Sequence, residues 1–144
     1  MSDDNIIEQF KKQIADAKQN STTIRIRGGG TKDFYGVSLE GDLLETKSYS
    51  GISEYEPTEL VITAKSGTPL KLIEKTLNEN NQMLAFEPPH MGPEASFGGC
   101  IASGLCGPRR ASQGAVRDLV LGVRMLNSEG IDLQFGGKVM KNVA

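Results

Sequence analysis

Three consecutive glycines at residues 28–30 constrain the fold of this chain more than any other feature. Residues 22–27 alternate polar and apolar side chains as a half-buried strand does, and Thr31 and Lys32 follow the glycines directly. Residues without a Cβ can adopt left-handed conformations, so their N–H groups can face one concavity. We therefore expect a strand that leads into a backbone loop suited to a phosphate or diphosphate, with a hydroxyl from Thr31 and a positive charge from Lys32.

Two common nucleotide-binding motifs do not fit the spacing around this loop. A dinucleotide fingerprint would need a glycine where the chain has Asp33, and a P-loop would need lysine directly after the last glycine, where Thr31 stands. The loop is thus neither a Rossmann nor a Walker loop. A glycine-rich turn that binds no ligand stays open as the alternative to a phosphate nest.

Composition narrows the class of protein. The length of 144 residues fits one domain with a real core, and 38% hydrophobic residues are too many for a disordered chain. A net charge of −2 provides no basic field, so we expect no nucleic-acid partner. No apolar run reaches bilayer length and the start is acidic, so we expect a cytoplasmic protein without a direct membrane span. Cys100 and Cys106 lack metal-ligand spacing, and we interpret both as small packing residues.

The periodicity of the first half predicts a helix followed by a small βββαβ layer. The helix covers residues 5–20 with Asp3 or Asp4 as its cap, and its apolar face consists of Ile6, Ile7, Phe10, Ile14 and Ala17. We expect strands at residues 21–27, 43–46, 60–64 and 83–86, a loop over 48–57, and a second helix with Thr68 as N-cap and Pro69 at its first position, ending near Asn78.

The second half differs in composition. Residues 91–110 are rich in Gly, Ala, Ser and Pro, and long segments of this kind are usually functional or disordered. Phe97, Ile101 and Leu105 have helical spacing, which predicts a short interior helix over residues 99–103. A strand at 118–126, a turn at 127–130 and a return strand at 131–135 form a predicted hairpin.

Seven blocks of the sequence carry a family resemblance through their order: residues 26–36, 64–70, 82–90, 97–99, 103–110, 116–124 and 135–144. This ordered set resembles the FAD-binding domain of the vanillyl-alcohol-oxidase superfamily, also called the PCMH-type fold. The similarity is greatest to the FAD-binding E subunits of bacterial glycolate oxidases. The resemblance implies an α+β FAD-binding domain over 1–144, made of an N-terminal helix (1–20), a first subdomain (21–90) and a partial second subdomain (91–144). Since chains of this family continue beyond the position of Ala144, we expect the flavin domain to be incomplete at its C-terminus.

The resemblance also implies which residues hold the cofactor. The pyrophosphate loop would be residues 27–32, and the later segment would line the rest of the FAD. The candidate residues are Arg27, Gly28, Gly29, Gly30, Thr31, Lys32, Pro89, Ser96, Gly98, Gly99 and Ser103. Relatives with covalent flavin carry a histidine where this chain has Thr31, so we expect noncovalent FAD.

By the same resemblance, the chain would be the FAD-binding subunit of a multisubunit 2-hydroxy-acid (glycolate) oxidase or dehydrogenase, inactive when isolated. A second flavin subunit and an iron–sulfur subunit would be its partners, and any membrane contact would run through them. The cap domain that contacts substrate in the superfamily has no counterpart here, so no catalytic residue is named. Two alternatives stay open: an assembly subunit with an empty flavin site, and a generic binder of phosphate ligands.

Two charged candidates keep two interpretations each. His90, the only histidine, is either a proton shuttle beside the flavin or a structural histidine bonded to backbone. The structural interpretation is favoured, because a proton shuttle needs an orienting partner and none can be identified in the sequence. Arg109 and Arg110 either bind a phosphate or carboxylate or contact a partner subunit.

Overall fold

The computed structural model describes residues 2–37 and 40–137, and these residues form an α+β structure, which confirms the predicted fold class. The last part of the resemblance block at residues 135–144, residues 138–144, lies outside the described residues. The helices are α1 (Asp3–Asn20), α2 (Leu70–Asn78), α3 (Phe97–Ser103), α4 (Arg110–Gln113) and α5 (Val116–Leu119). The strands are β1 (Ile24–Arg27), β2 (Asp42–Glu45), β3 (Ile52–Glu56), β4 (Val61–Ala64), β5 (Gly122–Leu126) and β6 (Asp132–Gly136).

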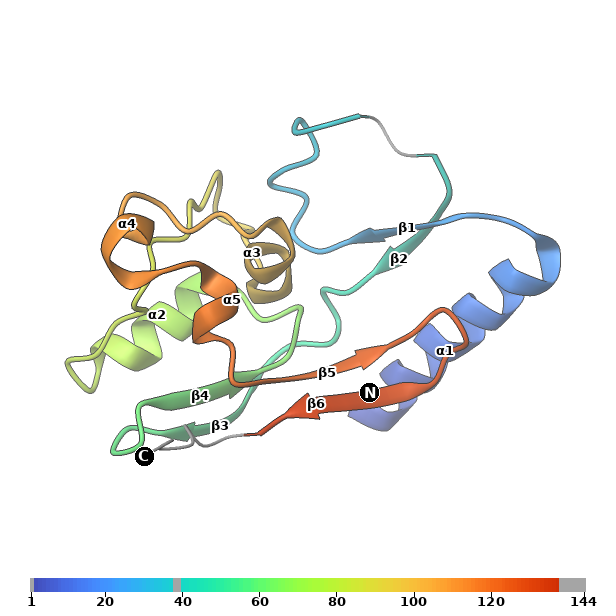
Figure 1. The fold of residues 1–144 in the computed structure, drawn as a ribbon. Coiled ribbons are helices and arrows are strands. Elements are labelled where there is room, and N and C mark those ends of the chain that lie inside the picture. The colour runs from blue at the N-terminus through green and yellow to red at the C-terminus, as the bar shows by residue number, and fades with distance from the viewer. Residues whose placement is uncertain (1, 38–39, 138–144) are drawn as a thin grey trace.

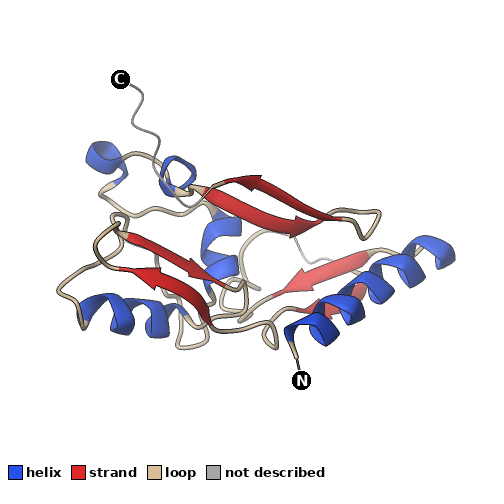
Figure 2. Ribbon diagram, turned by 90° about the horizontal axis from the view of Figure 1, so that it is seen from below, coloured by secondary structure: helices blue, strands red, loops and turns tan. Residues whose placement is uncertain are grey.

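The described strands form three separate pairs. Strands β1 and β2 are parallel, whereas β3 with β4 and β5 with β6 are antiparallel. Helix α1 packs beside β1–β2 at one end of the molecule, and the four shorter helices gather at the other end (Figure 1). Figure 2 shows the three pairs as distinct ribbons seen from below. The predicted βββαβ layer is therefore wrong in its connectivity, because four strands precede α2.

Two predicted segments of the first half differ from the structure. Residues 52–56, predicted as loop, form β3, in which only Ile52 and Tyr55 are half-buried and the other residues are exposed. Such a polar strand has little apolar alternation, and it exists through its pairing with β4. Residues 83–86, predicted as a strand, belong to no strand. Phe86 is buried in the core and Leu84 packs against it, whereas Met83 is exposed.

Both predicted helix caps are wrong. Ser2, rather than Asp3 or Asp4, caps α1 by accepting a hydrogen bond from the Asn5 N–H. At α2 the residue before the first turn is Pro69, and Thr68 makes no cap bond. The Thr68 hydroxyl is fully buried and donates instead toward the carbonyls of Lys65, at 2.7 Å, and Gly51, at 3.0 Å. It thus ties the end of β4 to the loop before β3.

The second half confirms a short helix and a hairpin. Helix α3 begins two residues before the predicted start, because Ser96 caps it by accepting from the Gly99 N–H. The turn is held by Asn127 Oδ1, which accepts from the N–H groups of Glu129 and Ile131. The predicted strand begins too early, since residues 116–119 form α5, where the Asp118 carboxylate accepts from the Ala115 N–H at 3.0 Å.

Buried hydrophobic residues lie on α1, on α2 and behind α3. On α2, Leu70 and Ile73 are fully buried. Behind α3, a second cluster joins Phe86, Val116 and the two cysteines. Both cysteines are free thiols, as expected of packing residues, and burial raises the pKa of Cys100 to about 11. That thiol is therefore protonated at neutral pH. None of the described helices is long and apolar enough to cross a bilayer.

Candidate cofactor site

The triple-glycine loop packs against a segment that lies more than sixty residues later in the chain. A Cβ on Gly29 would lie 1.5 Å from the carbonyl oxygen of Glu94, so the two backbones touch here. A Cβ on Gly28 would lie 2.4 Å from the hydroxyl of Ser96. The structure thus brings the two glycine-rich segments singled out in the sequence into direct contact, and that contact requires glycine at position 29, where the neighbouring atom belongs to the backbone.

Arg27 and Asp33 close the loop on itself. The Arg27 Nε donates to Asp33 Oδ2 at 2.7 Å, and Glu45 lies 3.9 Å from the same guanidinium. This hydrogen bond holds the pKa of the Asp33 carboxyl below its usual value. Gly30 has a φ of +70°, and a Cβ there would meet the Arg27 guanidinium at 2.2 Å. Arg27, a predicted cofactor ligand, has its charge engaged in shaping the loop.

The backbone donors of the loop point to an anion. Within residues 2–37 and 40–137, no acceptor receives the N–H groups of residues 28–32, and each of these five residues is half-buried. Half-buried donors without acceptors are costly unless water or a ligand satisfies them. Lys32 makes no ion pair with any described residue, and its charge is felt by the Cys100 thiol. The loop therefore offers a row of donors and one available cation, which is what a diphosphate needs.

The later glycine segment is built differently. The N–H of Gly98 donates to the Ser66 carbonyl at 2.7 Å, and the N–H of Gly99 donates to the Ser96 hydroxyl. A Cβ on Gly98 would lie 2.7 Å from the Cβ of Ser66. The Ser103 hydroxyl donates to the Cys100 carbonyl at 2.9 Å. These backbone donors are already used, so the segment can offer a ligand its surface and the spare lone pairs of its hydroxyls, but no free N–H row.

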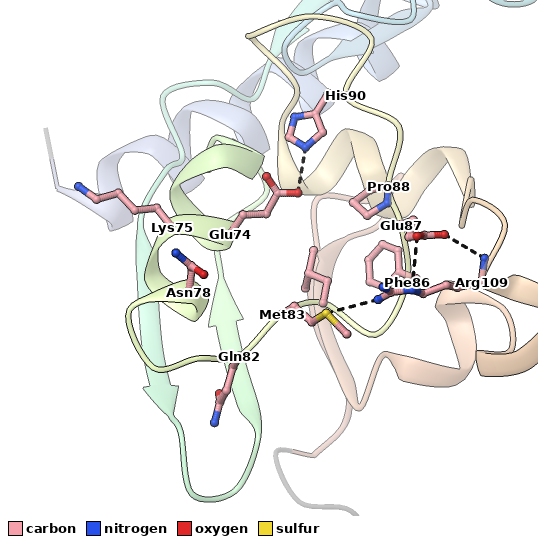
Figure 3. A pocket seen from close by; sticks show the side chains of 11 residues that line it. Glu74, Lys75, Asn78, Gln82, Met83, Phe86, Glu87, Pro88, His90 and Arg109 are labelled. Carbon is pink, nitrogen blue, oxygen red and sulfur yellow. Dashed lines mark hydrogen bonds and ion pairs between the residues drawn. The ribbon is translucent and has the colours of Figure 1, made fainter.

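Pro89, the remaining candidate, is half-buried between two residues that line a cavity of about 660 Å³. None of the predicted cofactor residues lines this cavity, which lies between α2, the 82–90 segment and Arg109 (Figure 3). Two side-chain contacts lie in the cavity: His90 Nε2 lies 2.9 Å from Glu74 Oε1, and Arg109 Nε lies 3.3 Å from Glu87 Oε1. His90 therefore bonds to a carboxylate on α2, not to backbone, and Arg109 pairs within its own chain.

Two residues near these sites are not predicted from the sequence: Glu74 at the cavity and Arg25 on β1. Glu74 was unremarkable in the sequence, because nothing local relates it to His90 sixteen residues later. Arg25 shares the strand face of Arg27, and its Nε is buried without a hydrogen-bond partner in the described structure. Its charge also acts on Asp33. The sequence signal for Arg25 is its alternation with isoleucines in residues 24–27, which places Arg25 on the same strand face as Arg27.

Comparisons with known proteins identify the family of this chain. Residues 6–135 match the model of the FAD binding domain family. Glycolate oxidase subunit GlcE of Escherichia coli (strain K12) is 49% identical over 139 residues, a match that covers 96% of this chain and 39% of that protein. D-lactate dehydrogenase of Archaeoglobus fulgidus is 31% identical over 143 residues, covering 94% of this chain and 30% of the relative.

A solved structure shows the same fold. Alkyldihydroxyacetonephosphate synthase superposes with a TM-score of 0.67 at 18% sequence identity, and the match covers 95% of this chain and 25% of that one. The chain thus spans less than half the length of each of these proteins. The row of free donors and Lys32 fits the diphosphate of the family's cofactor. With a family match over residues 6–135, this chain belongs to the family of FAD-binding domains of the PCMH type.

Proposed function

We propose that this chain is the FAD-binding part of a 2-hydroxy-acid oxidase or dehydrogenase of the glycolate oxidase kind. The observation that carries the proposal is the unbonded N–H row of residues 28–32 beside Lys32, in a chain 49% identical to a glycolate oxidase subunit. Residues 1–144 would form one FAD-binding unit, with an N-terminal helix (1–20), a first subdomain (21–90) and a partial second subdomain (91–144).

The chain's own residues would bind and orient the cofactor. The N–H groups of residues 28–32 would donate to the diphosphate oxygens, and the Lys32 ammonium would offset their charge. Arg27 and Asp33 would hold the loop in shape, and Gly98 and Gly99 would offer a flat surface. Thr31 stands where relatives with covalent flavin carry a histidine, so the cofactor would be noncovalent. When bound, FAD would accept a hydride equivalent from the substrate.

The partners belong to the same proposal. The GlcE relative is by its name a subunit of glycolate oxidase. We propose that this chain also assembles with a second flavin subunit and with an iron–sulfur subunit, and that these partners receive the electrons. A small 2-hydroxy acid would be oxidised in the complex. The location would be cytoplasmic, with membrane contact only through those partners.

One observation favours a second candidate, an assembly subunit whose flavin site stays empty. Gly29 and Gly98 are needed by contacts within the protein, at Glu94 and Ser66, before any ligand is considered. Glycines in these loops would be retained by such a subunit as well.

Reconstitution tests the enzymatic proposal. The FAD-incubated chain is mixed with the other subunits of a glycolate oxidase, and dye reduction is followed with glycolate. We expect no reduction by the chain alone and glycolate-dependent reduction by the mixture. The mixture without this chain is the control. A mixture that assembles but gains no glycolate-dependent rate from the chain would favour the assembly subunit.

A further inference from the structure

The segment from residue 88 to residue 94, here called the strap, lies against the triple-glycine loop. It contains Pro88, Pro89 and Pro93, and its turn places Met91 at φ +46° and Gly92 at φ +126°. Within the described chain, no backbone hydrogen bond joins residues 88–94 to any other residue. A segment without backbone pairing owes its position to its side chains and to packing.

The strap forms one wall of the loop. The Glu94 carbonyl oxygen occupies the space beside Gly29, and a Cβ on Gly92 would lie 3.4 Å from the Thr31 methyl group. These contacts place two residues of the donor row, Gly29 and Thr31, against the strap. A displacement of the strap would therefore change the spacing of the donors that face the diphosphate.

Two side-chain anchors hold the strap to the rest of the protein. Glu94 pairs with Lys47 at 3.2 Å, and both side chains are largely exposed. His90 pairs with Glu74 at 2.9 Å, and these side chains are about one-third exposed, at 35% and 39%. Glu74 follows the fully buried Ile73 on α2, so its carboxylate projects from a rigid base (Figure 3). The His90–Glu74 pair is the better shielded anchor, and it lies in the middle of the strap.

We infer that His90 and Glu74 are positioning residues for FAD: their hydrogen bond fixes the strap against the triple-glycine loop and so keeps the diphosphate donors in register. The inference rests on the proposed function, since it assumes that the loop binds FAD. Neither side chain needs to touch the cofactor. The pair acts through Glu94 and Gly92, which do touch the loop.

Paired substitutions on the whole chain test this. Glu74→Ala removes the acceptor, whereas Glu74→Gln keeps an amide oxygen that can accept from the imidazole. Glu8→Ala, which breaks the 2.8 Å Glu8–Lys11 pair on α1, is the matched control far from the strap. The dissociation constant for FAD is measured by quenching of flavin fluorescence, and the melting temperature of the FAD-free chain by circular dichroism.

We expect Glu74→Ala to weaken FAD binding by about tenfold, the lower end of what loss of one charge-assisted hydrogen bond costs, because the pair acts on the cofactor only through the strap. Glu74→Gln should restore most of the affinity, and Glu8→Ala should bind as the parent does. His90→Ala should repeat the Glu74→Ala result, and the double variant should be no weaker than either single one, because both changes break the same bond.

The outcomes separate the two proposals. If the parent chain binds no FAD, the proposed function fails. If it binds FAD and Glu74→Ala binds equally well, the positioning role is overturned while the proposed function stands. A Glu74→Gln variant as weak as Glu74→Ala would also overturn the role, since the amide keeps the bond. Should Glu74→Ala not fold, His90→Ala and His90→Gln decide by the same comparison.

Discussion

Replacing Gly29 with alanine is expected to weaken FAD binding by about a hundredfold or more, because several phosphate hydrogen bonds depend on the loop's position. The new Cβ would fall 1.5 Å from the Glu94 carbonyl oxygen, a backbone atom that cannot turn aside as a side chain can. Loop and strap must therefore separate. Titration of flavin fluorescence measures the loss, and circular dichroism checks that the variant stays folded.

Gly28→Ala is the matched control for this experiment. Its Cβ would meet the Ser96 hydroxyl at 2.4 Å, and a hydroxyl can rotate away at the cost of the α3 cap bond. We expect an effect of about tenfold or less on FAD affinity. Equal losses in both variants would show that the Glu94 contact is not what limits the loop. An unchanged affinity in Gly29→Ala would contradict the described packing of loop and strap.

Replacing Ile73 with alanine is expected to lower the free energy of unfolding by about 2–5 kcal/mol. Ile73 is fully buried on α2, and truncation leaves a cavity behind the helix that carries Glu74. Urea or thermal unfolding followed by circular dichroism measures the change. In a small domain this is a large share of total stability.

Leu72 provides the comparison on the same helix, since its side chain is 42% exposed. Leu72→Ala should cost less than about 1 kcal/mol. A similar loss in both variants would contradict the orientation of α2, because that orientation alone distinguishes the two neighbouring residues.

Elements with strong local signals could be predicted from the sequence. The helical repeat of Ile6, Ile7, Phe10, Ile14 and Ala17 predicts α1. Of these residues, Ile6, Ile7 and Ala17 are buried, and Phe10 and Ile14 are half-buried. The turn residues 127–130 between two apolar strands predict the β5–β6 hairpin. In each case the pattern and the stabilising contact lie within a few residues of each other.

Elements that depend on distant contacts could not be predicted. Strand β3 carries mostly exposed polar residues, and only its register with β4, such as Tyr55 opposite Ile62, defines it. Residues 83–86 are apolar and so resemble a strand in the sequence, but they form none. Phe86 instead packs in the core cluster with Cys100 and Cys106. Local propensity does not contain this tertiary information.

The candidate site shows the same division. The glycine loop is predicted from residues 22–32, and the composition of residues 91–110 indicates a second functional segment, whose contacts to the flavin come only from the resemblance to a family. That Glu94 packs on Gly29, and that Glu74 holds His90, follows only from the fold. The sequence predicted a bare loop for ligand access, whereas the structure shows that Gly28 and Gly29 also serve a contact within the protein.

The most direct test of the central claim is whether the purified chain retains FAD. The chain is incubated with FAD and desalted, its visible absorption spectrum is recorded, and acid precipitation then shows whether flavin is released; circular dichroism of the same sample reports folding. We predict a flavin spectrum at close to one FAD per chain, with all flavin released by acid. A folded chain that emerges from desalting without flavin would contradict the assignment of residues 28–32 as a diphosphate site.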